Sequence, residues 1–158
     1  MKILWQVSFR PFSKSNVNDE IQKKFVENLK KINADITLSV TQFDDYGVKS
    51  FLDKSNIKFK YFNFTKKKLP KGSKYSNSIM LNNSIKFLIS KDFDYFIFSN
   101  ADVFVSKKIT EILKKQSHND YMGFIYPNTL FKNGKKHETL LPHYGIDFIV
   151  FKLSKKKS

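Results

Sequence analysis

The sequence predicts an α/β fold, a three-layer sandwich built around a mainly parallel β-sheet. Apolar runs of strand length alternate along the chain with segments in which apolar residues recur at helical spacing. The length of 158 residues is that of one domain, and a hydrophobic fraction of 41% with 17 phenylalanines can supply its core. We therefore expect residues 1–151 to form a single domain and residues 152–158 to form a basic tail.

The first strand and the first helix are the most clearly marked elements. Residues 2–9 form a short apolar run that Arg10-Pro11 ends, as expected of a buried strand. Asn18 or Asp19 is placed to cap the helix that follows. The apolar face of this helix is formed by residues at helical spacing, namely Ile21, Phe25, Val26, Leu29 and Ile32. A strand followed by an amphipathic helix is the first half of a βαβ unit.

The later segments continue this alternation. Further strands are predicted over 36–43, 57–64, 95–105, 121–126 and 146–151, and helices over 46–54, over 77–90 and after a Ser106 cap. The segment 127–142 is polar and has a proline at each end, which predicts a loop. In a sheet of this kind, ligands bind at the carboxyl ends of the strands.

The chain carries 29 basic and 14 acidic residues, which gives a formal net charge of +15. Such an excess is typical of proteins that bind nucleic acid or anionic surfaces. Only one basic residue, Arg10, is an arginine, whereas nucleic-acid sites use arginine for bidentate and stacking contacts. Lys, Phe, Ile and Asn make up 72 of the 158 residues, the usage expected of AT-rich codons. Codon bias therefore explains the charge better than a nucleic-acid partner does, although a lysine-rich surface allows peripheral contact with an anionic membrane.

The sequence also excludes several kinds of site. It contains no cysteine, so a disulfide framework, a zinc knuckle and a thiol nucleophile are excluded. Residues 1–9 lack the long apolar region and the cleavage site of a signal peptide. No stretch approaches the roughly 18 apolar residues that a membrane span needs. These observations predict a soluble, cytoplasmic protein.

Polar side chains follow three of the predicted strands. Ser8 to Arg10 ends the first strand and Asp44-Asp45 ends the second, while Asn100 and Asp102 interrupt the apolar run of the fourth. Residues two apart in an extended chain point to the same side, so Asn100 and Asp102 can both face one hard cation. Such paired oxygens suit Mg²⁺ or Mn²⁺, with phosphate oxygens completing the coordination shell. A solvated turn is the alternative for both acidic sites.

The segment from Asp94 to Val103 resembles the D-x-D strand end of nucleotide-sugar glycosyltransferases with the GT-A fold. Over roughly residues 1–151, two further features resemble this family in the same order. Asp44 and Asp45 are similar to an acidic pair near the nucleotide base, and Asn83 lies in a helix similar to the family's A-R-N-x-G helix. The resemblance implies metal-assisted transfer of a sugar from a nucleoside-diphosphate donor to a hydroxyl of a saccharide or lipid-linked acceptor.

The donor site expected from these features combines one basic residue with the acidic and amide residues of the motifs. Arg10 joins it as the single arginine at a strand end. The set is Arg10, Asp44, Asp45, Asn83, Asn100 and Asp102, in which Asp102 and Asn100 are the expected ligands of Mn²⁺ or Mg²⁺.

The sequence departs from the family at two points. Asn100 replaces the first acid of the D-x-D motif, which leaves Asp102 as the one charged ligand. The chain also stops soon after the strand at 146–151, where such enzymes continue into an acceptor-binding segment with a general base. Asp147 and His143 are weak candidates for that base, because a surface histidine and a capping or ion-paired aspartate explain them as well. Two other functions stay open: a basic module for nucleic acid or anionic surfaces, and a catalytically inactive GT-A-like domain.

Overall fold

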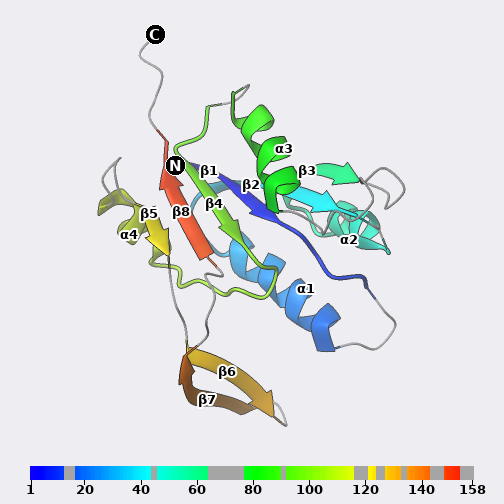
Figure 1. Ribbon diagram of the computed structural model, residues 1–158, viewed down its shortest axis with the longest axis vertical. Coiled ribbons are helices and arrows are strands. Elements are labelled where there is room, and N and C mark those ends of the chain that lie inside the picture. The colour runs from blue at the N-terminus through cyan, green and yellow to red at the C-terminus, as the bar shows by residue number, and fades with distance from the viewer. Residues whose placement is uncertain are drawn as a thin grey trace.

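The computed structural model describes residues 1–12, 17–43, 46–63, 77–89, 92–115, 121–123, 127–132, 135–142 and 148–153 (Figure 1). The helices are α1 (Val17–Lys30), α2 (Val48–Lys54), α3 (Asn77–Ile89) and α4 (Ile109–Lys115). The strands are β1 (Lys2–Val7), β2 (Asp35–Gln42), β3 (Lys58–Asn63), β4 (Tyr95–Ser99), β5 (Tyr121–Gly123), β6 (Pro127–Lys132), β7 (Lys135–Pro142) and β8 (Phe148–Lys152).

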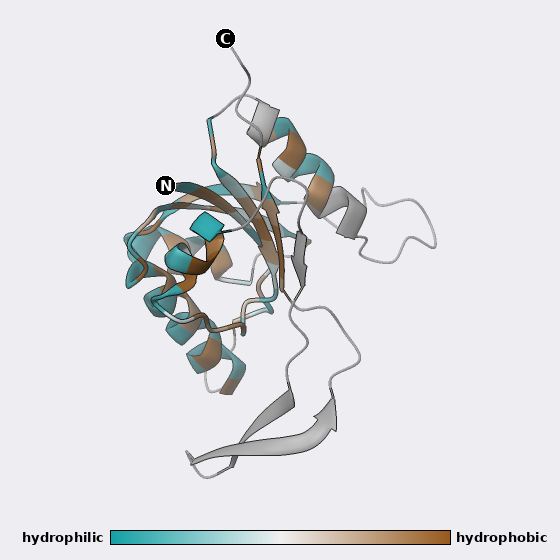
Figure 2. Ribbon diagram, turned by 90° about the vertical axis from the view of Figure 1, so that its left-hand side faces the viewer, coloured by the Kyte–Doolittle hydropathy of each residue, from teal (hydrophilic) through white to brown (hydrophobic). Residues whose placement is uncertain are grey.

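The central sheet has the strand order β3-β2-β1-β4-β8-β5. β1 pairs in parallel with both β2 and β4, and β2 pairs in parallel with β3, whereas β8 is antiparallel to its neighbours β4 and β5. The chain thus runs outward from β1 to β3 and returns to the other side of β1 with β4 (Figure 1). Helices lie on both faces of the sheet (Figure 2). The predicted α/β fold with a mainly parallel sheet is confirmed.

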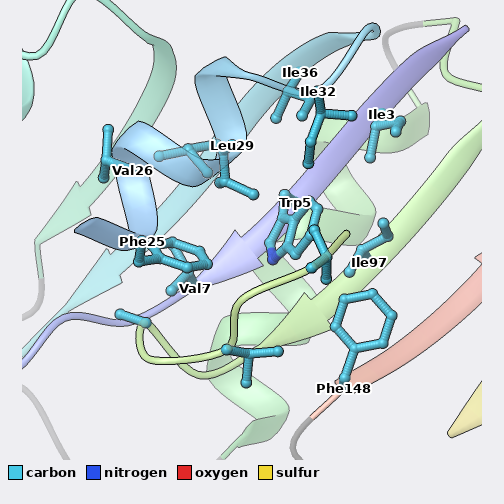
Figure 3. Close-up of a cluster of buried hydrophobic side chains, with 14 of the residues drawn as sticks. Ile3, Trp5, Val7, Phe25, Val26, Leu29, Ile32, Ile36, Ile97 and Phe148 are labelled. Atoms are coloured by element: carbon cyan, nitrogen blue, oxygen red, sulfur yellow. The ribbon is translucent and has the colours of Figure 1, made fainter. Parts of the chain in front are cut away.

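The hydrophobic core lies on the face of the sheet that α1, α2 and α4 cover. Alternate residues of β1 point to this face, and Trp5 at its centre is fully buried. Phe25 of α1 and Phe148 of β8 pack edge-to-face against the Trp5 ring, with centroid distances of 6.1 and 5.5 Å (Figure 3). These contacts join α1, β1 and β8 into one core.

The opposite face of the sheet is packed against α3 over β1 and β2. Here the sheet carries buried polar side chains, which need hydrogen-bond partners because water is excluded. Ser84 of α3 supplies partners for two of them: its hydroxyl is 2.8 Å from that of Ser39 on β2 and donates to Oε1 of Gln6 on β1. The Ser84 side chain thus forms hydrogen bonds with polar side chains of two neighbouring strands.

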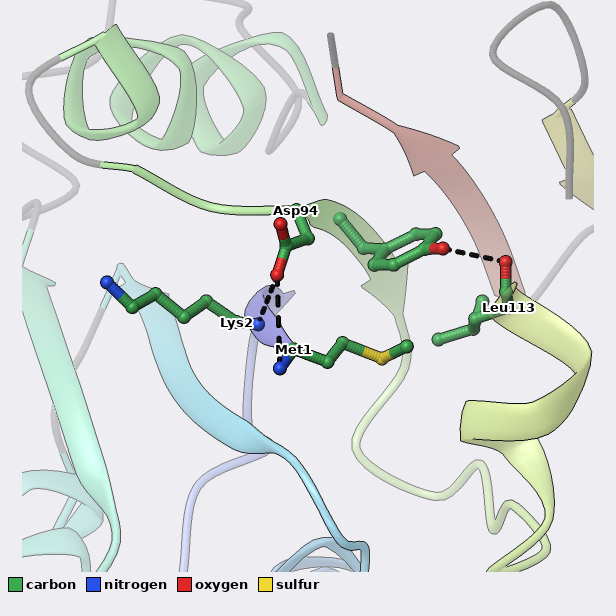
Figure 4. Close-up of polar contacts among 5 residues, drawn as sticks. Met1, Lys2, Asp94 and Leu113 are labelled. Carbon is green, nitrogen blue, oxygen red and sulfur yellow. Dashed lines mark hydrogen bonds and ion pairs between the residues drawn. The ribbon is translucent and has the colours of Figure 1, made fainter. Parts of the chain in front are cut away.

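Asp94 contacts the first two residues of the chain at the amino-terminal edge of the sheet (Figure 4). Its carboxylate accepts a hydrogen bond of 2.8 Å from the Lys2 backbone N–H and lies 4.0 Å from the amino group of Met1. The next residue, Tyr95, is buried and donates its hydroxyl proton to the Leu113 carbonyl of α4 at 2.7 Å. Burial raises the pKa of Tyr95, and the nearby charge of Asp94 acts in the same direction. This edge is opposite to the one where ligands are expected.

Two predicted boundaries and one predicted cap are wrong. α1 begins at Val17, so Asn18 and Asp19 lie in its first turn rather than at its cap. The fourth strand ends at Ser99 and not at residue 105, because its ladder with β8 ends at the Ser99 pair and β1 supplies no partner beyond Phe98. Ser106 was predicted to cap the next helix, but α4 begins at Ile109, and Ser106 lies in the preceding turn, where its hydroxyl accepts from the Lys108 N–H at 3.3 Å.

The segment predicted as a polar loop, 127–142, instead contains a β-hairpin. β6 and β7 pair antiparallel, with Lys132 opposite Lys135, and form a sheet of their own that lies apart from the central one (Figure 1). The residues at 133 and 134 are Asn and Gly, the pair that most favours a tight hairpin turn. The Asn-Gly dipeptide predicts a hairpin more strongly than the polar composition of the segment predicts a loop.

Candidate functional site

A pocket of about 220 Å³ lies at the carboxyl ends of β1 and β4. Its position is the point where the strand order reverses, since the chain leaves β1 toward β2 on one side and returns as β4 on the other. Crevices at such switch points are the usual ligand sites of open α/β sheets. The lining comes from the ends of both strands and from the first turns of α1: Ser8, Phe9, Arg10, Asn18, Ile21, Gln22, Asn100, Ala101 and Asp102.

The loop after β1 is held by two glutamine side chains, each of which bonds both backbone polar groups of one residue. Gln42, at the end of β2, accepts from the Phe9 N–H at 2.7 Å and donates to the Phe9 carbonyl at 3.0 Å. Gln22 of α1 does the same for Arg10, with its amide group 3.2 Å from the Arg10 carbonyl. Both glutamines are buried, so these bonds are shielded from water. The loop is therefore fixed in position without being part of a strand.

The loop after β4 is anchored in the same way from α1. Asn28 donates to the Val105 carbonyl and accepts from the Val105 N–H, both at 3.0 Å. At its start, the Ser99 hydroxyl accepts from the Trp5 indole N–H at 2.7 Å and donates to the Asn100 carbonyl at 3.0 Å. The segment that carries Asn100 and Asp102 is thus tied to the core at both ends.

Arg10 and Asp102 are the two charged side chains among the residues that line the pocket. Both are exposed, and one guanidinium nitrogen of Arg10 donates to Oδ1 of Asn18 at 3.3 Å. A guanidinium can bind phosphate oxygens through paired hydrogen bonds. The pocket lining therefore contains one guanidinium and one carboxylate.

Asn100 and Asp102, the expected cation ligands, both line the pocket. Burial alternates from Asn100 to Val105, with Ala101, Val103 and Val105 buried, so Asn100 and Asp102 are exposed on the same side although the strand has ended. Among the described residues, no three His, Cys, Asp or Glu side chains are grouped as a complete metal site would need. One carboxylate and one amide oxygen fit Mg²⁺ or Mn²⁺ in sites where substrate phosphates and water supply the other ligands.

The structure brings together three of the six predicted donor-site residues, namely Arg10, Asn100 and Asp102. Asn83 does not line the pocket: it lies on α3, and its amide nitrogen is buried with no hydrogen-bond partner among the described residues. The other sequence candidates, Asp44, Asp45, His143 and Asp147, lie outside the described residues.

Sequence reasoning missed the residues that support the pocket, above all Gln22, Gln42 and Asn28. Each lies on a regular element and bonds a residue of a loop, 12, 33 and 77 positions away in sequence. Gln22 and Asn28 lie among other polar residues of an amphipathic helix, so the sequence does not distinguish them from solvent-facing side chains. The one available signal is Gln42, a polar residue at the end of the strand predicted over 36–43.

Replacing Gln42 with Ala should lower the free energy of unfolding by about 1–3 kcal/mol. The reason is that the Phe9 N–H and carbonyl lose their partner in a buried place. Urea unfolding measures the change, and Asn82→Ala, at an exposed position of α3, is the control with an expected change within about 0.5 kcal/mol. Equal losses in both variants would contradict a supporting role of Gln42.

Comparisons with known proteins agree with this architecture. No family model and no curated protein matches the sequence. Among solved structures, HddC from Yersinia pseudotuberculosis has a TM-score of 0.55 at 13% identity, over 96% of this chain and 76% of that protein. The 4-diphosphocytidyl-2C-methyl-D-erythritol synthase from Anaerococcus prevotii has a TM-score of 0.53 at 12% identity, over 95% and 69%.

A third similar structure, a protein from Desulfovibrio desulfuricans assigned to the nucleotide-diphospho-sugar transferases, has a TM-score of 0.52 at 12% identity, over 96% of this chain and 62% of that one. At such identities the likeness shows the fold alone: the three proteins share the α/β architecture of this chain. In the described residues, no helix is both long and apolar enough to cross a membrane.

Proposed function

We propose that this chain is a glycosyltransferase that binds a nucleoside-diphosphate sugar at the pocket between β1 and β4 and transfers the sugar to an acceptor hydroxyl. The observation that carries the proposal is that Arg10 and Asp102 both line a pocket at the switch point of the sheet. A diphosphate bridged to a divalent cation has the complementary charges. The fold shared with nucleotide-diphospho-sugar transferases supports the same class of donor.

Arg10 acts on the leaving diphosphate. As the bond between the sugar and the diphosphate breaks, negative charge grows on the bridging phosphate oxygen, and hydrogen bonds from the Arg10 guanidinium stabilise it. The Gln22 contacts to the Arg10 backbone keep this residue in place before the substrate arrives. Because the residue is already in place, less rearrangement of the protein is needed during the reaction.

Asp102 and Asn100 would hold Mn²⁺ or Mg²⁺ beside the same diphosphate. When bound, the cation supplies Lewis-acid stabilisation of the leaving group. The acceptor hydroxyl also requires a base, and the lining of the pocket offers no carboxylate other than Asp102 and no imidazole among the described residues. Asp147 and His143 remain the proposed candidates for that role.

Thermal-shift screening tests the proposal with UDP-, GDP- and CDP-sugars and with CTP and GTP, each with and without Mn²⁺, at low and high salt. A shift that requires both Mn²⁺ and one diphosphate sugar, and that persists in high salt, supports the proposal. A shift with triphosphates alone would replace sugar transfer by nucleotidyl transfer, the kind of chemistry that the name of the similar diphosphocytidyl-erythritol synthase suggests.

The same screen separates the two remaining alternatives. Shifts with any polyanion that vanish in high salt indicate a basic binding module. A specific donor that binds but yields no product with saccharide or lipid-linked acceptors indicates an inactive domain.

A further inference from the structure

A basic surface segment follows the pocket loop over residues 107–115. This α4 segment comprises α4 and the turn before it. It has four lysines and one glutamate, whereas α1 carries three lysines and three acids. All five charged side chains of the α4 segment are exposed, namely Lys107, Lys108, Glu111, Lys114 and Lys115. The segment therefore presents an excess of positive charge to solvent.

The lysines of the α4 segment form no ion pair with any acid in the described part of the chain. On α1, in contrast, Lys23 and Lys30 lie 2.9 Å from carboxylate oxygens of Glu20 and Glu27. Such a pair cancels much of the charge that an approaching anion meets, whereas an unpaired lysine keeps its full charge. Codon usage explains how many lysines the chain has, but not where they stay unpaired.

A large apolar side chain, Ile112, lies among these lysines. The Ile112 N–H bonds the Lys108 carbonyl at 3.3 Å, so Lys108 precedes it by one helical turn. Lys115 follows Ile112 by three residues and lies on the same flank of the helix. Ile109 and Leu113 are buried and fix the inward face of α4, while Ile112 is 44% exposed. The outer flank of α4 thus combines one apolar side chain with a lysine on each side of it.

The α4 segment is fixed to the core. The Leu113 carbonyl accepts from the buried Tyr95 hydroxyl at 2.7 Å. Just before the segment, Asn28 of α1 bonds both backbone groups of Val105 at 3.0 Å. A surface that is already ordered loses little conformational entropy when it binds a partner.

We propose that the α4 segment docks on an anionic phospholipid bilayer. Its four lysines contact the headgroups, and Ile112 enters the boundary between headgroups and acyl chains. A bilayer supplies hydrocarbon for Ile112 directly beneath an anionic surface, whereas nucleic acid presents phosphate charge there. The single arginine of the chain, Arg10, also lies outside the α4 segment, which removes the side chain best suited to nucleic acid.

The docked bilayer lies close to the pocket. The chain from Asp102 to Lys107 spans at most about 18 Å even when fully extended. An acceptor held in the bilayer therefore starts near the donor site, which favours a lipid-linked acceptor over a free saccharide. This last step rests on the proposed function, whereas the docking itself does not.

Co-sedimentation with vesicles tests the charged part of the proposal. The vesicles are of phosphatidylcholine alone or of phosphatidylcholine mixed with phosphatidylglycerol, and no donor is present. The double variant Lys108→Gln/Lys115→Gln is compared with Lys23→Gln/Lys30→Gln, which removes the same charge from ion-paired positions of α1. The wild type should bind the anionic vesicles only, and less at high salt.

The α4 double variant should bind anionic vesicles about 10- to 30-fold more weakly, since each lysine near such a surface contributes roughly 5-fold. The α1 double variant should bind nearly as the wild type does. Equal losses in both would mean that the net charge of the whole protein drives binding, and would overturn docking through α4. Urea unfolding verifies that both variants are folded.

The apolar part is tested with Ile112→Ser and a matched control, Ile85→Ser, at a 49% exposed position of α3. Ile112→Ser should weaken binding to anionic vesicles by about 3- to 10-fold and leave binding to heparin, a polyanion without hydrocarbon, unchanged. Ile85→Ser should alter neither. If Ile112→Ser binds vesicles like the wild type, the surface recognises polyanions in general and the bilayer proposal is overturned.

Docking and the proposed function fail separately. A wild-type protein that binds a nucleoside-diphosphate sugar but no anionic vesicle overturns docking and leaves the proposed function standing. One that binds vesicles through α4 but no nucleotide overturns the proposed function, and with it the inference of a lipid-linked acceptor.

Discussion

Replacing Asp102 with Asn is expected to abolish the Mn²⁺-dependent part of donor binding. Asp102 is the one carboxylate that lines the pocket, so the variant leaves the cation with two neutral amide oxygens. Loss of groups that merely support a metal ligand already costs about 10- to 100-fold in metal affinity, and loss of the charged ligand should cost about 100-fold or more. Titration of the donor in the presence and absence of Mn²⁺ measures the effect.

The control for this change is Asp92→Asn, which alters the net charge equally at an exposed position before β4. Both variants should unfold within about 0.5 kcal/mol of the wild type, because both residues are exposed. The converse change, Asn100→Asp, adds a second carboxylate and should strengthen Mn²⁺ dependence. Mn²⁺-dependent binding that survives in Asp102→Asn would remove Asp102 from the metal site.

Most strands of the central sheet could be predicted from the sequence, because they are apolar runs or, in β3, an alternation of apolar and polar residues. Predicted strands at 2–9, 36–43, 57–64 and 146–151 correspond to β1, β2, β3 and β8 to within about two residues. The exact end of a strand depends on where its neighbouring strands stop pairing with it, which is a property of the tertiary structure. This is why β4 ends at Ser99, beyond which neither β1 nor β8 pairs with it, although apolar residues return from Val103 to Val105.

Three polar residues of the candidate site could be predicted from the sequence, but the contacts that hold them in place could not. Arg10, Asn100 and Asp102 stand out as polar residues after buried strands, and the structure places all three at one pocket. Their convergence depends on β4 pairing with β1 rather than β3, which no local pattern encodes. The side-chain amides that hold the two loops bond residues up to 77 positions away in sequence. In the sequence alone, Asn28 therefore looks like any other polar residue on a helix surface.

Replacing Trp5 with Ala should lower the free energy of unfolding by about 3–5 kcal/mol, a large share of the roughly 5–15 kcal/mol that holds a domain of this kind together. The indole is fully buried and packs against both Phe25 and Phe148, so its removal leaves a cavity between α1, β1 and β8. Urea unfolding followed by far-UV circular dichroism measures the loss, because Trp5 is the only tryptophan and its fluorescence disappears with it. Ile112→Ala, at a 44% exposed position of α4, is the control and should change little.

Trp5→Phe separates the packing of the ring from its hydrogen bond. Phe fills most of the space but cannot donate to Ser99, whose hydroxyl also bonds the Asn100 carbonyl at the start of the pocket loop. A loss of about 1–3 kcal/mol is expected from the missing bond and the smaller ring. Because Ser99 connects this bond to the loop that carries Asp102, Trp5→Phe should also weaken Mn²⁺-dependent donor binding while the protein stays folded. If Trp5→Phe binds the donor like the wild type, then the indole serves the core alone and the Ser99 contact does not position the pocket.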